Sequence, residues 1–573
     1  MASLNARLRR ERLAAESGTI FKRWRKRVRI ALVYPNVYGV AMASLGFQTV
    51  YRLLNAPYQV VCERAFLPEA DRGEHPVVTL ESGRRLNDFD CVAFSLAFEN
   101  DYPNVLTLLQ KTALPLLSAQ RGTPLPLILA GGVAVFLNPE PLAPLIDCFL
   151  LGEAEVTLPA FIQRFDPRRE RRAMLLELAR DVPGAYVPAF YAPRYAKDGT
   201  LSDFEAQAAV PAKIQRVYAP HLEKFDTVST VVTPHAGFED AHLIEVSRGC
   251  PRGCRFCAAG FIYRIPRTRP LPALLKSMRK GAAGTRKIGL VGTAVSDLPD
   301  LKALCAHGQT LDLQLAFSSL RADVLDDTLI AALRSGRLKT AAIAPEVGSQ
   351  RLRRVLNKGL TEEDILTAAE RLVAGGIPNL KLYFMAGLPT EQAEDITAIV
   401  TLVKRIKSRF LRASRARGRM GSITVSLNCF VPKPSTPFQW SAMESVRALK
   451  QKLKKIKQRL NRVANVRVKA DVPRQAYLQA LLARGDRRVA GLLIQAHANK
   501  GNWPQTFKGA SLDTDFYARR QRKRRERLPW DFIDHGIDKD FLWREYRRSL
   551  KAQTSKPCPM DPQKCRICGV CRD

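Results

Sequence analysis

Short apolar runs alternate with amphipathic stretches in the first third of the chain. Helix-like residues 104–120 lie between two of these runs. Short apolar strands separated by helices are typical of a parallel α/β sheet. We therefore predict a doubly wound, Rossmann-like α/β domain over residues 29–165. Its expected strands lie within 29–39, 90–98, 126–132 and 146–155.

A second alternation of strands and helices begins near residue 239. Six such units predict a partial (β/α)6 barrel over residues 239–470, with its active face at the C-terminal ends of the strands. In the last part of this region, residues 447–463 place apolar side chains at steps of three and four, which predicts an amphipathic helix. The expected strands lie at 242–247, 287–292, 313–320, 340–345, 380–387 and 423–430.

The rest of the chain divides into three further regions. Residues 1–28 form a basic N-terminal arm, and residues 166–238 form an irregular connecting segment. Residues 471–573 form a C-terminal basic region that ends in a group of four cysteines.

The charge of the chain changes the picture of its partners. Against 54 Asp and Glu residues stand 91 Lys and Arg residues, so the formal net charge is +37. A field of this sign favours polyanions, which include RNA, DNA and anionic membranes, and RNA is the partner we favour. Basic residues gather in the arm, in 447–463 and in 519–527, where Arg522, Lys523 and Arg524 are candidate RNA contacts. The alternative is a set of solvated charged faces without a ligand.

No segment predicts secretion or membrane insertion. The longest apolar stretch, 125–137, is interrupted by Pro126 and by Gly131 and Gly132. It is also shorter than the roughly 20 residues of a membrane-spanning helix. We therefore expect a cytoplasmic protein without a membrane span. In that compartment, clustered cysteines indicate metal binding or catalysis rather than disulfides.

Three cysteines directly follow the first expected barrel strand. Cys250, Cys254 and Cys257 have the spacing C-x3-C-x2-C. Three thiolates would hold three corners of a [4Fe–4S] cluster and leave the fourth iron open to a small molecule. A zinc knuckle is the alternative, but zinc usually takes four ligands. The nearest candidate for a fourth, His242, lies eight residues upstream.

This spacing, followed by six strand–helix units, resembles the radical S-adenosylmethionine (SAM) superfamily. The resemblance implies a [4Fe–4S] cluster, SAM bound to its open iron, and a flavodoxin-like or ferredoxin-like electron donor. One departure is "VGTAVSD" (291–297), where many members carry Gly-Gly-Glu for the SAM amine. The SAM contacts that the resemblance implies are Gly292, Ser319, Arg321, Glu346, Gly348, Ser349 and Gly387.

The N-terminal domain resembles cobalamin-binding domains in the stretches "ILAGGVAVFLNPEPLA" (128–143) and "LLGEAEVTLPAF" (150–161). Residues 34–46 lack the His of the usual cobalt-binding loop, so cobalamin would be bound without a protein His ligand. The alternative is a domain that binds nothing and shapes the substrate channel. The cobalamin contacts that the resemblance implies are Ser95, Leu96, Gly131, Gly132, Gly152 and Glu153.

Four further cysteines close the chain with the spacing C-x6-C-x2-C-x2-C. They are Cys558, Cys565, Cys568 and Cys571. Four thiolates complete a coordination shell, so zinc and a second iron–sulfur cluster both fit.

Over most of its length, the chain resembles an uncharacterised family of cobalamin-binding-domain radical SAM proteins. That resemblance implies a cobalamin-dependent enzyme that transfers a methyl group to an unactivated carbon. The basic segments favour RNA or a nucleoprotein as its substrate. One alternative is a radical SAM enzyme that modifies a peptide or a small molecule. Another is a non-catalytic regulator that binds cobalamin or SAM and associates with nucleic acid. The sequence assigns no catalytic acid, base or nucleophile.

Overall fold

The computed structural model describes residues 2–69, 77–238, 240–317, 320–418, 420–561, 563 and 565–571, with side chains from residue 6 onward. The chain divides into two compact units. Unit 1 comprises Met1–Ala241, Leu481–Tyr517 and Arg525–Gly536, and unit 2 comprises His242–Ala480, Ala518–Arg524 and Ile537–Asp573. The expected C-terminal region 471–573 is therefore shared between the two units and does not form a third one.

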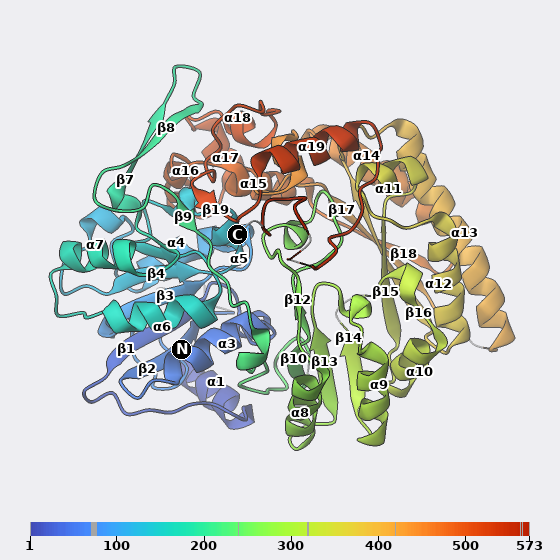
Figure 1. The fold of residues 1–573 in the computed structure, drawn as a ribbon, viewed down its shortest axis with the longest axis horizontal. Helices are drawn as coiled ribbons and strands as arrows, with labels where there is room; N and C mark the ends of the chain where they lie inside the picture. Colours follow the sequence, from blue (N-terminus) through green and yellow to red (C-terminus); the bar gives the residue numbers. More distant parts are fainter. Residues whose placement is uncertain are drawn as a thin grey trace. The chain divides into compact units, whose positions relative to one another are not determined.

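Unit 1 is built on a six-stranded sheet with the order β2-β1-β3-β4-β5-β6 (Figure 1). Every neighbouring pair is parallel except β5 and β6. The order 2-1-3-4-5 is that of flavodoxin-like doubly wound sheets. The α/β class predicted from the sequence is confirmed. The strands are β1 (Val28–Tyr34), β2 (Val60–Phe66), β3 (Cys91–Ser95), β4 (Leu127–Gly131), β5 (Cys148–Leu150) and β6 (Ala185–Tyr186).

Helices and short strands complete unit 1. A hairpin of β7 (Tyr191–Tyr195) and β8 (Leu201–Ala206) occupies the connecting segment, and β9 (Ile214–Gln215) pairs with β19 (Ile533–Asp534) from the C-terminal part of the chain. The helices are α1 (Ala2–Ala15), α2 (Tyr38–Met42), α3 (Leu45–Asn55), α4 (Tyr102–Lys111), α5 (Val133–Leu137), α6 (Ala154–Arg164), α7 (Arg171–Asp181), α16 (Val489–Ala498) and α17 (Trp503–Lys508).

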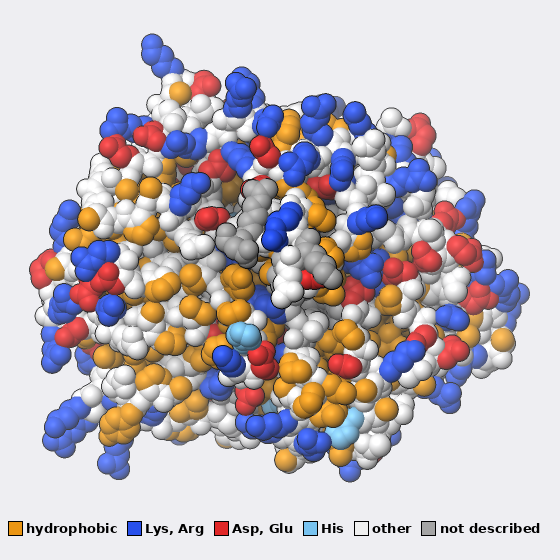
Figure 2. Space-filling model, viewed as in Figure 1, with side chains coloured by type: hydrophobic (Ala, Val, Ile, Leu, Met, Phe, Trp, Pro, Cys, Tyr) orange, Lys and Arg blue, Asp and Glu red, His pale blue; other side chains and the backbone are white. Residues whose placement is uncertain are grey.

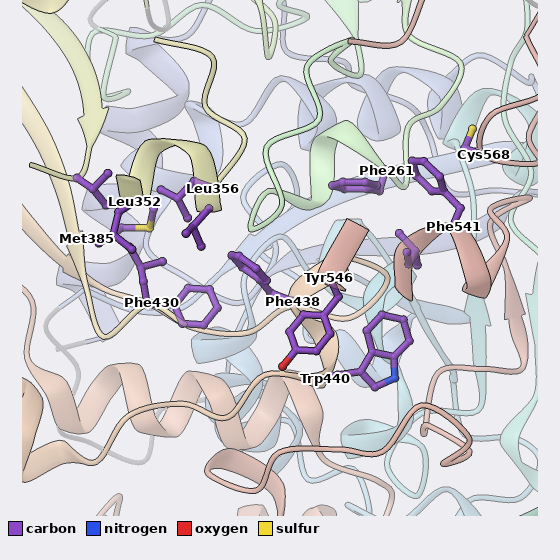
Figure 3. Packing of buried hydrophobic residues seen from close by; sticks show 14 residues of the cluster. Phe261, Leu352, Leu356, Met385, Phe430, Phe438, Trp440, Phe541, Tyr546 and Cys568 are labelled. Atoms are coloured by element: carbon purple, nitrogen blue, oxygen red, sulfur yellow. The ribbon is translucent and has the colours of Figure 1, made fainter. Parts of the chain in front are cut away.

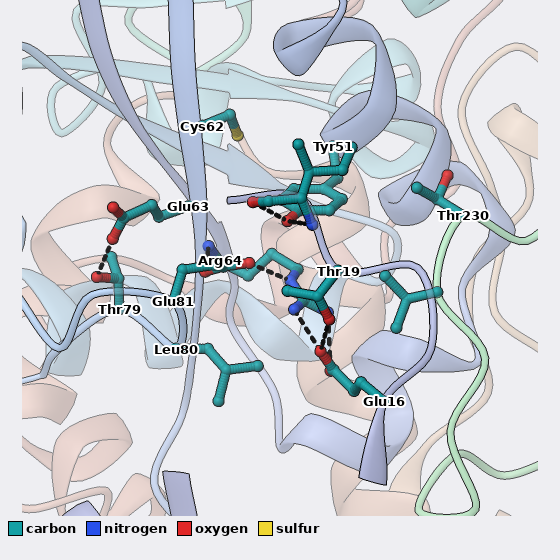
Figure 4. A network of polar contacts seen from close by, with 12 residues as sticks. Glu16, Thr19, Tyr51, Cys62, Glu63, Arg64, Thr79, Leu80, Glu81 and Thr230 are labelled. Carbon is teal, nitrogen blue, oxygen red and sulfur yellow. Dashed lines mark hydrogen bonds and ion pairs between the residues drawn. The ribbon is translucent and has the colours of Figure 1, made fainter. Parts of the chain in front are cut away.

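The basic arm is folded onto unit 1 by buried charge. Arg64 in β2 donates to Glu16 at 2.9 and 2.6 Å and to Glu81 at 2.6 Å (Figure 4). Lys22 Nζ donates to the carbonyl oxygens of Pro57 and Val60 at 2.8 and 2.9 Å. Because these charges are used inside the unit, the arm is not a free cationic tail.

In the part of unit 2 that the structure describes, seven parallel strands follow one another in chain order. β10, β13 and β14 form one sheet, β15 to β18 form another, and an isolated bridge from Leu320 to Ile343 joins them. All six strands expected in the barrel are present, and β18 is an additional one. Successive parallel strands are the arrangement of a (β/α) barrel. The strands are β10 (His242–Glu245), β13 (Lys287–Val291), β14 (Gln314–Phe317), β15 (Thr340–Glu346), β16 (Asn379–Ala386), β17 (Ile423–Cys429) and β18 (Val466–Ala470).

Amphipathic helices cover the strands of unit 2. The helix expected at 447–463 is confirmed as α14 (Val446–Leu460), which buries Leu449, Leu453, Ile456 and Leu460. The other helices are α8 (Leu271–Ala282), α9 (Leu301–Thr310), α10 (Asp327–Ser335), α11 (Gln350–Val355), α12 (Glu362–Ala374), α13 (Ala393–Ala416) and α19 (Lys539–Leu550). None of the described helices is long and apolar enough to cross a membrane.

Candidate functional site

The cysteine loop of unit 2 follows β10 directly. Strand β11 (Ser247–Arg248) pairs with β12 (Arg267–Thr268), and this short ladder closes the base of the loop. Cys250, Cys254 and Cys257 are free thiols of intermediate exposure. Burial raises the pKa of all three thiols, that of Cys257 to about 12. A bound cation such as iron would favour the thiolate form of these three residues.

Two arginines of this loop region pair with carboxylates. Arg252 makes a bidentate contact with Asp297 at 3.0 and 2.9 Å, and the hydrogen bonds with Asp297 raise the pKa of Arg252. Arg248 reaches Glu245 at 2.9 Å through both Nε and Nη2. These residues shape the loop through pairs with carboxylates.

A third arginine, Arg255, anchors the loop from inside. Its side chain is fully buried and donates to Glu545 of α19 at 3.2 and 3.0 Å. It also donates to the carbonyl oxygens of Arg354 and Val355, both at 3.0 Å, and to that of Gln553 at 2.8 Å. The sequence offered no signal for this role, since the partners lie about 100 and 290 residues away.

Glu346 ends β15 with a left-handed backbone, φ 66°. Lys358 Nζ donates to its Oε1 at 2.8 Å, and the two side chains are 13% and 12% exposed. Burial raises the pKa of the Cys254 thiol, and the nearby charge of Lys358 opposes part of that shift. The structure thus places the predicted carboxylate beside the cysteine loop, and adds a buried lysine that sequence reasoning missed.

Gly348 and Ser349 serve the packing of α11 and α13. A Cβ atom on Gly348 would lie 2.1 Å from the backbone nitrogen of Ile399. The Ser349 hydroxyl caps α11 by accepting from Leu352 N at 3.1 Å, and it donates to Asp395 at 2.5 Å. Both residues are therefore used within the fold at the positions where the resemblance implies SAM contacts.

Gly387 follows β16 with a positive φ of 87°. Its backbone N–H donates to the two carboxylate oxygens of Glu391 at 3.0 and 3.1 Å. Lys452 Nζ donates to the same carboxylate at 2.6 Å and to Glu444 at 2.9 Å. Gly387 therefore helps to hold the ion pair between Glu391 and Lys452.

The remaining predicted SAM contacts lie at the ends of β13 and β14. A Cβ atom on Gly292 would lie 2.6 Å from Ser247 Oγ, next to the base of the cysteine loop. Arg321 pairs with Asp323 at 2.9 and 2.8 Å. Burial raises the pKa of Cys250 and Cys254, and the charge of Arg321 opposes part of that shift. Ser319 lies outside the described residues.

Comparison with protein-family models identifies the family of the cysteine loop. Residues 46–188 match the family described as radical SAM proteins, N-terminal, and residues 244–403 match the radical SAM superfamily. The second match includes the three cysteines and the strands from β13 to β16. The chain belongs to the radical SAM superfamily. Membership implies a [4Fe–4S] cluster and SAM.

Individual proteins similar to this chain share less than a third of their residues with it. The uncharacterized protein MJ0966 of Methanocaldococcus jannaschii is 29% identical over 476 residues, which is 81% of this chain and 90% of that protein. A tRNA-2-methylthio-N(6)-dimethylallyladenosine synthase of Thermotoga petrophila is 25% identical over 48% of this chain and 63% of its own length. The structure of the cobalamin-dependent S-adenosylmethionine radical enzyme OxsB with aqua-cobalamin bound is similar at 13% identity and a TM-score of 0.45, over 83% of this chain and 68% of OxsB.

In unit 1 of this radical SAM protein, the Gly131–Gly132 pair lies at the C-terminal end of β4. Gly132 has φ 112°, and a Cβ atom there would lie 2.4 Å from Leu96 O. Leu96 N also donates to Gly131 O at 2.7 Å, and Leu96 is fully buried. The backbone that approaches Gly132 closely therefore belongs to the residue after β3, which ends at the half-buried Ser95.

Gly152 and Glu153, which follow β5, contact the backbone of residues 217–219. A Cβ atom on Gly152 would lie 2.6 Å from Val217 O. Glu153 N donates to the same oxygen at 3.0 Å, and the buried Glu153 carboxylate accepts from Ala219 N at 3.0 Å. Gly132 thus contacts the backbone after β3, whereas Gly152 and Glu153 contact residues 217–219.

The four C-terminal cysteines lie in unit 2 and are all free thiols. Cys565 and Cys568 are buried, whereas Cys558 and Cys571 have intermediate exposure. Burial is the main cause that raises the pKa of Cys571 to about 11, and the charges of the other three thiols raise it further. Within the described residues, no three His, Cys, Asp or Glu side chains are grouped as metal ligands.

Proposed function

We propose that this radical SAM protein is an enzyme that modifies RNA. Cys250, Cys254 and Cys257 would hold the [4Fe–4S] cluster, because three thiols on one loop are the donor set that leaves one iron open. The cluster with SAM supplies the homolytic chemistry needed at an unactivated carbon. The single observation that carries the choice of RNA is the exposed basic face of α14.

The outer face of α14 carries cations that no described carboxylate neutralises. Its apolar face is buried, so the cations project to the opposite side. The exposed residues from 447 to 462 with no ion pair to the described residues are Arg447, Lys450, Lys454, Lys455, Lys457, Arg459 and Arg462. Arg467 and Lys469 on the edge strand β18 are also exposed. Such a row suits a phosphate backbone, which contributes salt-sensitive affinity without sequence choice.

Other basic segments are less accessible to RNA, because several of their side chains are buried or already bonded. Lys22 of the arm is bonded to backbone carbonyls, and Arg522 is buried. Arg524 pairs with Asp540 at 2.9 Å. Figure 2 shows Lys and Arg interspersed with Asp and Glu on the visible face. The candidate RNA contacts Arg522, Lys523 and Arg524 are therefore a poorer choice than α14.

Several relatives support RNA as the substrate. Besides the Thermotoga enzyme, a tRNA-2-methylthio-N(6)-dimethylallyladenosine synthase of Chlorobium phaeobacteroides is 25% identical over 29% of this chain and 40% of its own length. These names describe tRNA-modifying enzymes. The chain spans only part of their length, so the specific reaction is not transferred to it.

Binding of a labelled RNA at several salt concentrations tests the proposal. The variant K450A/K454A/K457A removes three unpaired charges from α14. If each lysine contacts a phosphate of single-stranded RNA, the slope of log affinity against log salt falls by about 2. The matched control R405A/R409A/R412A removes three charges from α13, where Glu362, Glu363 and Glu370 already pair with them.

Each outcome has a clear meaning. Loss of RNA affinity in the α14 variant alone supports the proposal. Equal loss in both variants shows a diffuse charge effect, and no RNA binding by the unaltered protein redirects the search to a peptide or a small molecule. Formation of 5′-deoxyadenosine that depends on Cys250, Cys254 and Cys257 supports an enzyme over a non-catalytic regulator.

Cobalamin-dependent methyl transfer is a second candidate function. It is favoured by the flavodoxin-like order of the unit 1 sheet, because such sheets bind ligands where the strand order reverses, between β1 and β3. The assigned residues Gly132, Gly152 and Glu153 follow the C-terminal ends of β4 and β5, which are neighbours in this sheet. Cobalt content after incubation with hydroxocobalamin decides this point, and its absence would exclude the methyltransferase.

A further inference from the structure

Strands β16 and β17 alternate between apolar and polar residues. From residue 380 to residue 384, β16 reads LKLYF, and only Lys381 and Tyr383 are half-buried while the residues around them are buried. Strand β17 (ITVSLNC) has the same alternation, with Thr424 and Ser426 half-buried. Parallel strands that are covered on both faces are apolar throughout. The alternation therefore indicates that only one face of these strands is packed against helices.

The apolar residues face the outer helices of unit 2. Helix α14 contacts β16 and β18, and α12 contacts β15. In a (β/α) barrel the helices surround the strands, so the opposite face of the strands lines the inside. The polar residues of β16 and β17 therefore face the inside of the barrel.

The strand register arranges polar side chains from three neighbouring strands in two rows on this inner face. The first row is Lys381, Thr424 and Arg467, and the second row is Tyr383, Ser426 and Lys469. The inside of a (β/α) barrel is usually filled by layers of branched apolar side chains. Two rows of cations and hydroxyl groups at this place indicate a bound ligand rather than packing.

The rows contain cations that no carboxylate of the described residues neutralises. Arg467 and Lys469 are exposed, and neither forms an ion pair with a residue that the structure describes. Lys381 also has no carboxylate partner among the described residues, and its Nζ lies 4.7 Å from the centre of the Tyr383 ring. Positive charges gathered on one face attract an anion.

The inner face also supplies groups that suit a sugar or a base. Ser426 Oγ donates to Asn428 Oδ1 at 3.4 Å, so these two polar side chains of β17 point to the same side. Tyr383 adds an aromatic ring, and unstacked bases of RNA bind by stacking on such rings and by hydrogen bonds to their edges. The combination of cations, hydrogen-bonding groups and a ring fits a nucleotide.

An apolar cluster connects this face with the cysteine loop. Met385 follows Tyr383 by two residues in β16 and belongs to a buried cluster, in which Figure 3 shows it beside Leu352 and Phe430. Phe261, which follows the three cysteines, is part of the same cluster. The two rows therefore lie on strands that share one packed core with the cysteine loop.

We propose that the inner face of β16, β17 and β18 binds the nucleotide of the RNA that is modified, with its phosphate between Arg467 and Lys469 and its base beside Tyr383. This inference rests on the proposed function and deepens it. Enzymes that act on a base take it out of the stack and into a pocket. Because β18 is an edge strand that α14 contacts, the RNA reaches this face from the side of α14 without crossing another strand of that sheet.

Photo-cross-linking tests this site on the full chain, reconstituted anaerobically with iron and sulfide. The probe is an RNA transcript in which 4-thiouridine replaces uridine, added at saturating concentration, and peptide mass spectrometry locates the adducts. We expect adducts within residues 379–386 and 423–429. In R467Q/K469Q, we expect the yield of these adducts to fall at least about fivefold and the slope of log affinity against log salt to fall by about 1.4.

The matched control R405Q/R412Q removes two cations from α13 that Glu362 and Glu370 already pair. We expect this control to keep both the adducts and the slope.

The outcomes separate this inference from the proposed function. RNA binding with adducts only on α14, or unchanged adducts in R467Q/K469Q, overturns the site on the inner face and leaves the proposed function intact. No RNA binding by the unaltered protein overturns both. If circular dichroism shows that R467Q/K469Q does not fold, K381Q removes the third cation and gives the same decision through the yield of adducts.

Discussion

Lys358 Nζ lies 2.8 Å from Glu346 Oε1, and this pair is almost removed from solvent beside the cysteine loop. Attraction to Glu346 and to the Cys254 thiolate raises the pKa of Lys358 against the opposing effect of burial. Such a pair is costly to break from one side, because the remaining charge is left buried without its partner.

We predict that K358M and E346Q each lower the free energy of local opening around β15 by about 3 kcal/mol. The double variant K358M/E346Q loses less than the sum, since neither buried charge remains. Native-state hydrogen exchange of residues 340–358 measures these values. K358R is the control that retains the charge, and strict additivity of the two single variants would contradict a coupled pair.

Alanine substitutions at Gly131 and Gly132 test whether the close approach of Leu96 requires glycine, with Gly131 as the control. G132A places a Cβ atom 2.4 Å from Leu96 O at a positive φ, so we expect a loss of at least about 2 kcal/mol in stability. In G131A the nearest atom would be 3.7 Å away, and the loss is smaller. Urea unfolding compares the two. Equal stability of both variants, with cobalamin binding lost only in G132A, would return Gly132 to a ligand-binding role.

The buried His535 makes the stability of unit 1 depend on pH. Burial and the nearby charge of Arg216 lower the pKa of His535 to about 3. An unfolded histidine has a pKa near 6.5, so the unfolded state binds a proton that the folded state excludes as the pH falls below that value. Stability is thus retained above pH 6.5 and lost on acidification.

From pH 7 to pH 5, this histidine accounts for about 2 kcal/mol of the lost stability. We predict that H535F loses less stability than the unaltered protein over the same interval, by about that amount. Urea unfolding at the two pH values gives the difference. The same acid sensitivity in H535F and in the unaltered chain would show that other groups are responsible.

A variant of Ser349 distinguishes a structural role of this residue from a role in SAM binding. S349A removes the cap of α11 and the hydrogen bond to Asp395, so we expect a loss of about 1 kcal/mol in stability. SAM affinity, measured by equilibrium binding, stays within twofold. S349N is the control that can still cap the helix. A tenfold weaker SAM affinity with unchanged stability would support the contact implied by the family resemblance.

The sequence predicted these strands because apolar residues dominate them, as in β4 (LILAG) and β16 (NLKLYFMA). It missed β2, whose centre contains Glu63 and Arg64, because a charged pair in a short run argues against a buried strand. The structure resolves this by pairing Arg64 with Glu16 and Glu81, which are 48 and 17 residues away. It also missed β18, a short edge strand whose side chains are mostly exposed.

Site residues were less predictable than strands. The cysteine spacing located the loop, because it depends only on local sequence. The contacts of Gly132, Gly152 and Ser349 depend on which residues, distant in sequence, pack against them. A local sequence pattern does not predict these contacts. Arg255 shows the same limit, since its buried partner Glu545 is 290 residues away in the chain.

The docking of the arm has a consequence for the order of events during synthesis. Ser17 pairs with Val232 through two backbone hydrogen bonds of 3.0 and 2.9 Å. At roughly 5–20 residues per second, a ribosome delivers Val232 some 10–40 seconds after Ser17. Ser17 therefore cannot form these two bonds until residue 232 has emerged, whereas Glu16 and Lys22 meet their partners Arg64, Pro57 and Val60 much earlier in synthesis.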